Sequence, residues 1–175
     1  MTEPTLFDDD PEYDPFPPAA WGVTLIDAQN TLRDELEPGS HCPCCGQYVK
    51  AYARAMTAFT GKAMIMMYRH HRDEYVQIPT LIRRYLPDMT QGGYATLGSY
   101  WGLIEEEKER REDGGRAGWW RLTEPGTQFV LGWLSVPRQA VIYDTKLLRY
   151  QGEMVTIRDV VKKQFDYEAL MRGDA

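Results

Sequence analysis

The sequence of 175 residues lacks several features that would point directly to a function. It has no apolar run near the roughly 18–20 residues that a membrane-spanning helix needs, so no membrane partner is expected. It also has no glycine-rich phosphate loop, no nucleophile elbow and no acid–base pair at a recognisable spacing, so an enzyme is not expected. The first residues are acidic and do not form a basic segment followed by an apolar one. This is unlike a secretory signal and predicts a cytoplasmic protein.

Cysteine and histidine are scarce, with three residues of each. An unpaired third cysteine in a cytoplasmic protein argues against a disulfide framework. All three cysteines fall in one short segment, His41-Cys42-Pro43-Cys44-Cys45-Gly46. Its last five residues have the C-P-x-C-G pattern of a zinc knuckle, in which two thiolates separated by two residues bind one Zn²⁺ with little strain.

A structural zinc ion needs four ligands, and the chain has no second cysteine pair. The remaining two ligands would come from His41, Cys44, His70, His71, a carboxylate or a second subunit. The adjacent histidines are the favoured pair, so the predicted zinc ligands are Cys42, Cys45, His70 and His71. Two alternatives stay open for the knuckle: a turn of the chain without metal, and a redox role. The two histidines could instead cap the end of a helix, where a cation stabilises the helix dipole.

Acidic residues are concentrated near the N-terminus. The chain has 26 acidic and 20 basic residues, of which the first 40 positions hold ten acidic and one basic, a net −9. Residues 41–175 therefore hold 16 acidic and 19 basic residues, a net +3. Residues 1–20 also contain five prolines and no helical periodicity, which predicts a disordered acidic arm. The mildly basic remainder is compatible with a nucleic-acid partner, although the whole chain carries −6.

Hydrophobic periodicity and capping residues predict the order of the elements. Helices are expected at residues 24–36, 47–71 with a break near Thr60-Gly61, 80–85, after a cap at 88–91, at 123–133 and from 156 to about 165. Strands are expected at 75–78, 103–108 and 119–122, followed by a hairpin of 140–143 and 147–150. The helix after residue 91, the charged turn between 108 and 119 and the returning strand have the order of a winged helix-turn-helix.

In a helix-turn-helix the second helix enters the major groove of duplex DNA. The spacing of Tyr94, Leu97 and Trp101 predicts that these side chains face the core. Gln91, Ala95, Thr96 and Ser99 would then face the groove, and the basic side chains of the wing would contact phosphates. No lysine or arginine lies on this outward face. The predicted DNA-contacting residues are Arg83, Arg84, Gln91, Thr96, Ser99, Lys108, Arg110, Arg111 and Arg116.

Two stretches carry a resemblance to known families. The segment Tyr100-Trp101-Gly102-Leu103-Ile104-Glu105, the charged wing with Asp113-Gly114-Gly115-Arg116, and Leu122-Thr123-Glu124-Pro125-Gly126 resemble the helix–wing–helix of MarR-like winged-helix transcription regulators over about residues 75–134. Together with the C-P-x-C-G knuckle and the Val136-Pro137 to Tyr143 tail, the pattern is similar to small uncharacterised actinobacteriophage helix-turn-helix proteins. This resemblance implies a phage-encoded transcriptional regulator in the host cytoplasm. Thr96 and Gly98 stand where such relatives have basic residues in the recognition helix.

These observations predict an α+β protein in three parts. An acidic arm with a short helix would span residues 1–40, a winged-helix domain opened by the knuckle 41–135, and a hairpin-and-helix extension 136–175. The expected partner is double-stranded DNA, with one structural Zn²⁺ and a homodimer as further candidates. The alternative is a protein-interaction module that binds a host protein on a scaffold without DNA contacts, and its acidic arm could cover the wing by mimicking phosphates.

Overall fold

A computed structural model describes residues 22–87, 93–108 and 118–174, so the predicted arm of residues 1–20 lies outside it. This described part has a mixed α+β fold with seven α-helices and three small antiparallel sheets. The chain divides into two compact units, Met1–Tyr52 and Ala53–Ala175. Among the described residues, no helix combines the length and the apolar character needed to cross a membrane.

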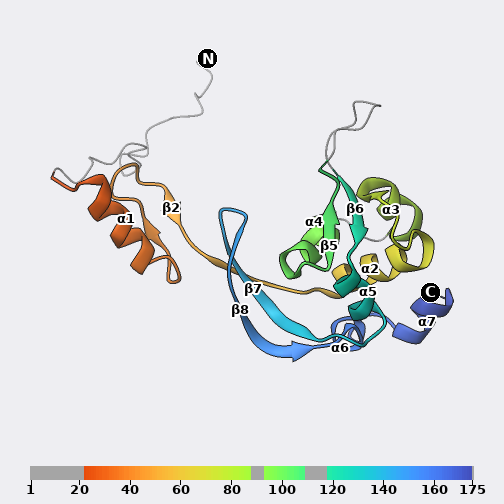
Figure 1. Cartoon of the computed structure of the whole chain (residues 1–175). Coiled ribbons are helices and arrows are strands. Elements are labelled where there is room, and N and C mark those ends of the chain that lie inside the picture. The colour runs from red at the N-terminus through yellow and green to blue at the C-terminus, as the bar shows by residue number, and fades with distance from the viewer. Residues whose placement is uncertain (1–21, 88–92, 109–117, 175) are drawn as a thin grey trace, which may run out of the picture. The chain divides into compact units, whose positions relative to one another are not determined.

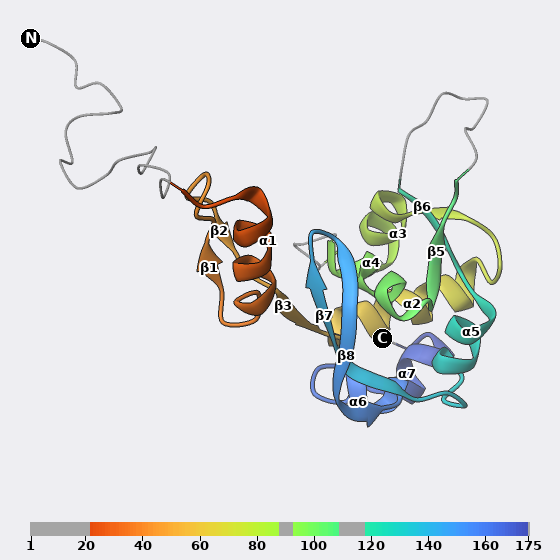
Figure 2. The same cartoon turned by 60° about the vertical axis from the view of Figure 1, so that its left-hand side comes forward.

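The first unit contains one helix and one short hairpin. Helix α1 (Leu25–Asp34) begins at the capping box that Thr24 forms with Asp27, which confirms the helix expected here. It lies beside the hairpin of β1 (Ser40–His41) and β2 (Tyr48–Val49) (Figure 2). The apolar side of α1 is mostly exposed: Ala28 is buried, but Leu25 is 73% exposed.

The helix expected over 47–71 is wrong in its first half. Residues 48–49 form β2 and Tyr52–Ala55 forms β3, and the helix begins only at α2 (Ala58–His70). Thr57 sets this start, because its hydroxyl accepts a hydrogen bond from the amide of Thr60. The apolar spacing before residue 57 therefore belongs to strands, and the expected break near Thr60-Gly61 lies inside a continuous helix.

Helix α2 is the centre of the second unit, and smaller elements surround it (Figure 1). In chain order these are β4 (Val76–Gln77), α3 (Ile78–Tyr85), α4 (Gly93–Thr96), the 3-10 helix η1 (Leu97–Trp101), β5 (Ile104–Glu106), β6 (Trp119–Leu122) and α5 (Glu124–Val130). Strand β6 lies between β4 and β5 in an antiparallel sheet, where Val76 pairs with Trp120 and Ile104 pairs with Leu122. The predicted strands 103–108 and 119–122 are therefore paired.

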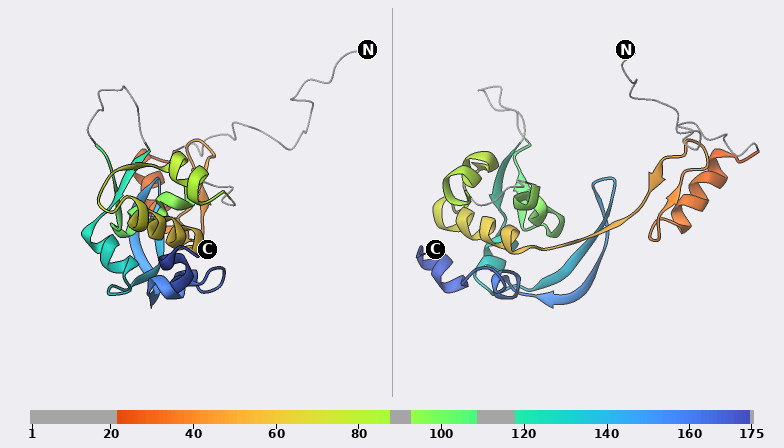
Figure 3. Two further views of the ribbon diagram at one scale, coloured as in Figure 1. Left: turned by 90° about the vertical axis from the view of Figure 1, so that its right-hand side faces the viewer. Right: turned by 180° about the vertical axis from the view of Figure 1, so that it is seen from behind.

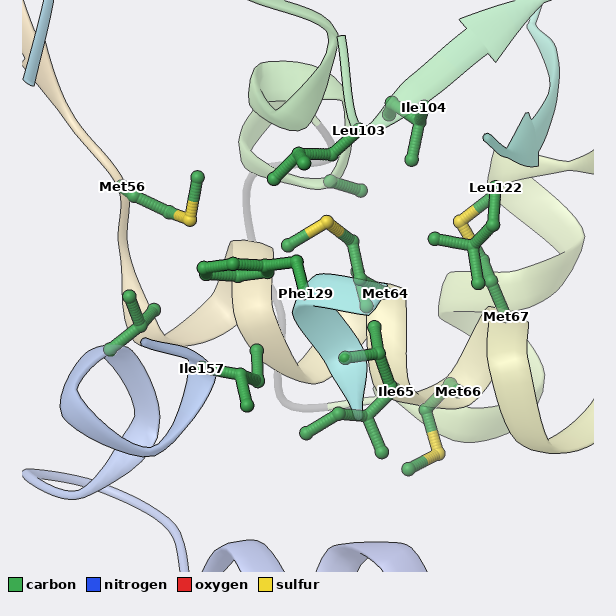
Figure 4. Close-up of a cluster of buried hydrophobic side chains, with 14 of the residues drawn as sticks. Met56, Met64, Ile65, Met66, Met67, Leu103, Ile104, Leu122, Phe129 and Ile157 are labelled. Atoms are coloured by element: carbon green, nitrogen blue, oxygen red, sulfur yellow. The ribbon is translucent and has the colours of Figure 1, made fainter. Parts of the chain in front are cut away.

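The core of the second unit is built on α2 (Figure 4). Met64 and Met67 are fully buried, together with Phe129 from α5 and Ile157 from α6 (Ile157–Val161). Gly61 permits the close approach of α6, because a Cβ atom at this position would lie 2.8 Å from Cγ1 of Val161. The core thus joins the helix–sheet part to the C-terminal extension.

The C-terminal extension contains a long, curved hairpin followed by two helices (Figure 3). Strands β7 (Val136–Tyr143) and β8 (Lys146–Val155) are longer than predicted, and β3 completes their sheet beside β7. Asp144 and Thr145 at the turn both have positive φ, as the common two-residue hairpin turn requires. The capping box of Thr156 and Asp159 opens α6 as expected.

Two details of this region differ from the prediction. Helix α5 ends at Val130, and Gly132 with φ of +78° turns the chain, so Trp133 is 78% exposed and does not line the core. The helix expected to continue to Phe165 ends at Val161. A separate helix α7 (Tyr167–Arg172), capped by Asp166, follows it.

Candidate nucleic-acid interface and cysteine knuckle

The helix expected to enter a DNA groove is short and changes type along its length. Helix α4 has four residues, and η1 continues it in 3-10 geometry. With three residues per turn, Ala95, Gly98 and Trp101 share one face, and all three are buried. Tyr94 is 37% exposed. The predicted faces are therefore wrong for Ala95 and Tyr94, because the prediction assumed 3.6 residues per turn.

Two other elements cover this helix segment. On one side, the hydroxyl of Thr60 in α2 donates to the carbonyl of Tyr94 at 2.9 Å, and Gly98 lies against Met64. On another side, Trp101 stacks on Tyr150 of β8, with ring centroids 6.4 Å apart. The Trp101 indole also donates to the carbonyl of Pro137 at 2.7 Å, and the Tyr150 hydroxyl donates to the carbonyl of Tyr100 at 2.8 Å. The C-terminal hairpin is thus fixed to the end of η1.

The predicted polar contacts on this helix are only partly available to a ligand. Ser99 and Thr96 are half-buried, and the Ser99 hydroxyl donates to the carbonyl of Thr96 at 2.7 Å. The Ser99 donor is therefore already used within the helix. Gln91 lies outside the described residues.

The described basic candidates lie on the neighbouring elements. Arg83 and Arg84 are exposed in the last turn of α3, and Lys108 is exposed just after β5. The Arg84 guanidinium also contacts the ring of Tyr85, 5.3 Å from its centroid. Arg110, Arg111 and Arg116 of the predicted wing lie outside the described residues.

The β5–β6 ribbon also carries acidic side chains. Glu105 accepts a hydrogen bond from Nε of Arg121 at 2.7 Å, and the Oε1 atom of Glu106 accepts one from the Gly118 amide at 3.4 Å. The Arg121 guanidinium at the base of the ribbon is therefore already paired with Glu105. Of the predicted phosphate-contacting residues, Arg83, Arg84 and Lys108 are therefore the ones that the structure describes.

The cysteine knuckle occupies the turn of the β1–β2 hairpin. The Cys42 amide donates to the carbonyl of Gln47, and the Gly46 amide donates to the carbonyl of Cys42, each at 2.8 Å. Gly46 has φ of +72°, which closes this turn. Cys44 and Cys45 are exposed, and Cys42 is half-buried. The sequence pattern therefore forms a tight, solvent-facing loop.

Hydrogen bonds within this loop converge on the sulfur of Cys42. The backbone amides of Cys44 and Cys45 donate to it, and this is the main reason that the pKa of the Cys42 thiol is lowered. Desolvation and the neighbouring Cys42 sulfur raise the pKa of the Cys44 thiol. The loop thus favours a thiolate at Cys42, the form that binds a metal.

The predicted histidine ligands lie in the second unit. The His70 ring stacks on Tyr85 with centroids 4.0 Å apart, and the His71 ring meets Tyr85 edge-on at 6.2 Å. Burial lowers the pKa of both histidines, so they are neutral at pH 7. Within the described ranges, no three His, Cys, Asp or Glu side chains are grouped so that they could hold a metal ion. The ligation of zinc by His70 and His71 stays a prediction.

Two surface features were not anticipated from the sequence. The β7–β8 hairpin carries several partly exposed apolar side chains: Tyr143, Leu147, Leu148, Tyr150 and Met154. Helices α6 and α7 border an open hollow of about 520 Å³ that Arg158, Lys162 and Lys163 help to line. Two of these cations are paired, Arg158 with Glu168 and Lys162 with Asp159. The hairpin predicted over 140–150 gave no indication of which of these side chains are exposed.

We compared the chain with protein-family models, with curated proteins and with solved structures. No family model matches it, and neither of the other two comparisons found a significant match.

Proposed function

We propose that residues 58–130 form a winged helix-turn-helix domain and that the protein is a DNA-binding transcriptional regulator encoded by a phage. The order of the elements supports this proposal: a central helix, a strand, two short helices and a two-stranded ribbon. The sheet also supports it, because β5 and β6 are adjacent and antiparallel, as the two strands of a wing are.

The proposed binding mode relies on phosphate contacts. Arg83, Arg84 and Lys108 are exposed on the elements that precede and follow the candidate recognition helix. Such contacts provide affinity and its salt dependence without reading the bases. The buried Ala95 and the internally bonded Ser99 leave little capacity for base recognition on the helix itself. We therefore expect binding with weak sequence preference.

The test is a fluorescence-anisotropy titration of the full chain with a random DNA duplex at several salt concentrations. Replacing Arg83 and Arg84 together with alanine should reduce the slope of log K against log salt by about two, roughly one for each lost phosphate contact. The matched control is Lys162→Ala with Lys163→Ala, which removes the same charge from the turn that follows α6. Absence of binding at low salt, or equal effects of the two double variants, would reject the proposal.

A second candidate function, binding of a host protein, is favoured by two observations. The α4–η1 segment is covered by α2 and the β7–β8 hairpin, while the hairpin exposes apolar side chains that include Leu148 at 49% and Met154 at 58%. Exposed apolar side chains that gather in a patch are typical of protein-binding surfaces. In this case a host protein would be recovered stoichiometrically after nuclease treatment. Recovery should be lost in Leu148→Asp and retained in the Arg83/Arg84 double variant.

A further inference from the structure

The knuckle presents half of a zinc site. Cys42 and Cys45 have the two-residue separation that lets a pair of thiolates bind one Zn²⁺, and structural sites are four-coordinate. The nearest other candidate, His41, donates through Nδ1 to the carbonyl of Gly46 at 2.9 Å and contacts Tyr48 with its ring, which leaves Nε2 as the ring atom that could bind a metal. No described group of three potential ligands surrounds a common point. The hairpin therefore offers two thiolates and lacks two further ligands.

The first unit has very little hydrophobic core to hold it together. Between residues 22 and 52, only Ala28 and Ala51 are buried, and both side chains are small. Of the larger apolar side chains on α1, Leu32 is half-buried, whereas Leu25 is 73% and Ile26 is 70% exposed. Below about 70–80 residues a single hydrophobic core rarely gives enough stability, and small natural units usually add disulfides, a metal ion or oligomerisation. This unit has no second cysteine pair for a disulfide framework, which leaves the metal and the oligomer.

We propose that one Zn²⁺ joins two copies of this chain through Cys42 and Cys45 of each copy. Four thiols would each lose a proton and bind the ion as thiolates, which gives a closed tetrahedral site. The position of the pair supports this arrangement, because the cysteines lie at the turn of a hairpin where Cys45 is exposed and a second hairpin can approach. A single bound ion would therefore stabilise the hairpin and also hold two chains together.

Cys44 is not among the proposed ligands. It is separated from Cys42 by only one residue and is adjacent to Cys45, and neither spacing is that of a knuckle pair. The Cys44 amide already donates to the sulfur of Cys42, as backbone amides do around bound thiolates. Cys44→Ser preserves this backbone donor and is the natural matched control for Cys42→Ser and Cys45→Ser.

The experiment measures mass and zinc content of the full chain under a reducing agent that does not bind metal. Light scattering after size exclusion should give the 20.2 kDa mass of one chain with a chelator and twice that mass after zinc is added. Native mass spectrometry should find one zinc ion for every two chains. One zinc ion bound to a single chain, or a mass that zinc does not change, would overturn the proposal.

The variants assign the ligands. Cys42→Ser and Cys45→Ser should each abolish the zinc-dependent doubling of mass, whereas Cys44→Ser and a His70→Gln/His71→Gln double variant should retain it. Loss of doubling in Cys44→Ser or in the histidine variant would reject the ligand set. Cobalt substitution gives a second readout, because the absorption of Co²⁺ distinguishes four thiolates from two thiolates with two histidines.

Folding of each variant can be checked independently of the metal. The core of the second unit contains no cysteine, so its cooperative unfolding transition should be the same in all three serine variants. This proposal also stands apart from DNA binding. Failure of zinc to join two chains would leave the anisotropy titration unaffected, and a negative titration would leave the mass measurement unaffected.

Discussion

The two units of this protein achieve order by different means. The second unit buries a continuous cluster around α2 that includes Met64, Met67 and Phe129. The first unit is organised by local hydrogen bonds, namely the Thr24 capping box and the paired backbone of the β1–β2 hairpin. Burial of apolar surface provides most folding free energy, so the second unit has its own source of stability. The described residues of the first unit have no comparable buried cluster, so the zinc ion proposed above would matter most there.

The largest effect is expected from removal of zinc, which should destabilise the first unit and leave the second unit unchanged. If the knuckle holds a structural ion, its binding free energy of about 10–16 kcal/mol is coupled to folding of the first unit. Hydrogen exchange of the full chain should then show protection of α1 (Leu25–Asp34) lost after chelation, while α2 (Ala58–His70) keeps its protection. Equal loss in both helices would contradict the separation of the two units.

Truncation of Phe129 is expected to have the next largest effect, confined to the second unit. Its ring is fully buried, so Phe129→Ala should destabilise this unit by about 3–5 kcal/mol in denaturant unfolding. Zinc-dependent mass should be unchanged. A cost below about 1 kcal/mol would show that this side chain is not part of a closely packed core.

The cap of α6 should contribute a smaller, pH-dependent effect. The Thr156 amide and hydroxyl donate to Asp159, mainly through the amide, and they lower the pKa of this carboxyl from 3.8 to about 2. A lowered native pKa stabilises the fold above the unfolded pKa near 4, and this contribution is lost as pH falls towards 2.

Two variants test this cap by denaturant unfolding. Asp159→Asn should therefore remove stability near neutral pH and little at the acidic end of the range. Thr156→Ala should cost about 1 kcal/mol at neutral pH. A stability difference between Asp159→Asn and the unmodified chain that does not change with pH would contradict the assignment.

The smallest effect is expected on α1. Ile26 is 70% exposed, so Ile26→Ala should change the stability of the metal-free chain by less than about 0.5 kcal/mol. Ile157, which is fully buried, provides the matched comparison, and Ile157→Ala should cost about 2–5 kcal/mol. If the two variants lost a similar amount of unfolding free energy in denaturant, the first unit would have a core of its own.

Much of the element order could be predicted because local signals mark the boundaries. Thr24, Thr123 and Thr156 each accept a hydrogen bond at a helix start, and the strand 119–122 forms as predicted. Predictions failed where the tertiary structure determines the local conformation. The apolar spacing at 48–56 fits a helix, but the turn at Gly46 directs residues 48–49 into a hairpin.

The candidate interface was harder to predict than the fold. The side chains that face the core in α4–η1 depend on the change from α to 3-10 geometry, which the sequence pattern does not specify. Contact between Trp101 and Tyr150 joins residues far apart in the chain, and no local rule indicates it. The exposure of Arg83 and Arg84, in contrast, follows from their position on the polar side of a short amphipathic helix.

The attachment of the β7–β8 hairpin to η1 has an evolutionary consequence. Trp101, Pro137 and Tyr150 form one interlocked joint through a ring stack and two hydrogen bonds to carbonyl groups. The helix–ribbon part and the extension therefore cannot be exchanged as separate modules between proteins. A homologue that replaces Trp101 with a residue lacking an aromatic ring is expected to carry a compensating change at position 150, so covariation of these two sites would trace the inheritance of the joint.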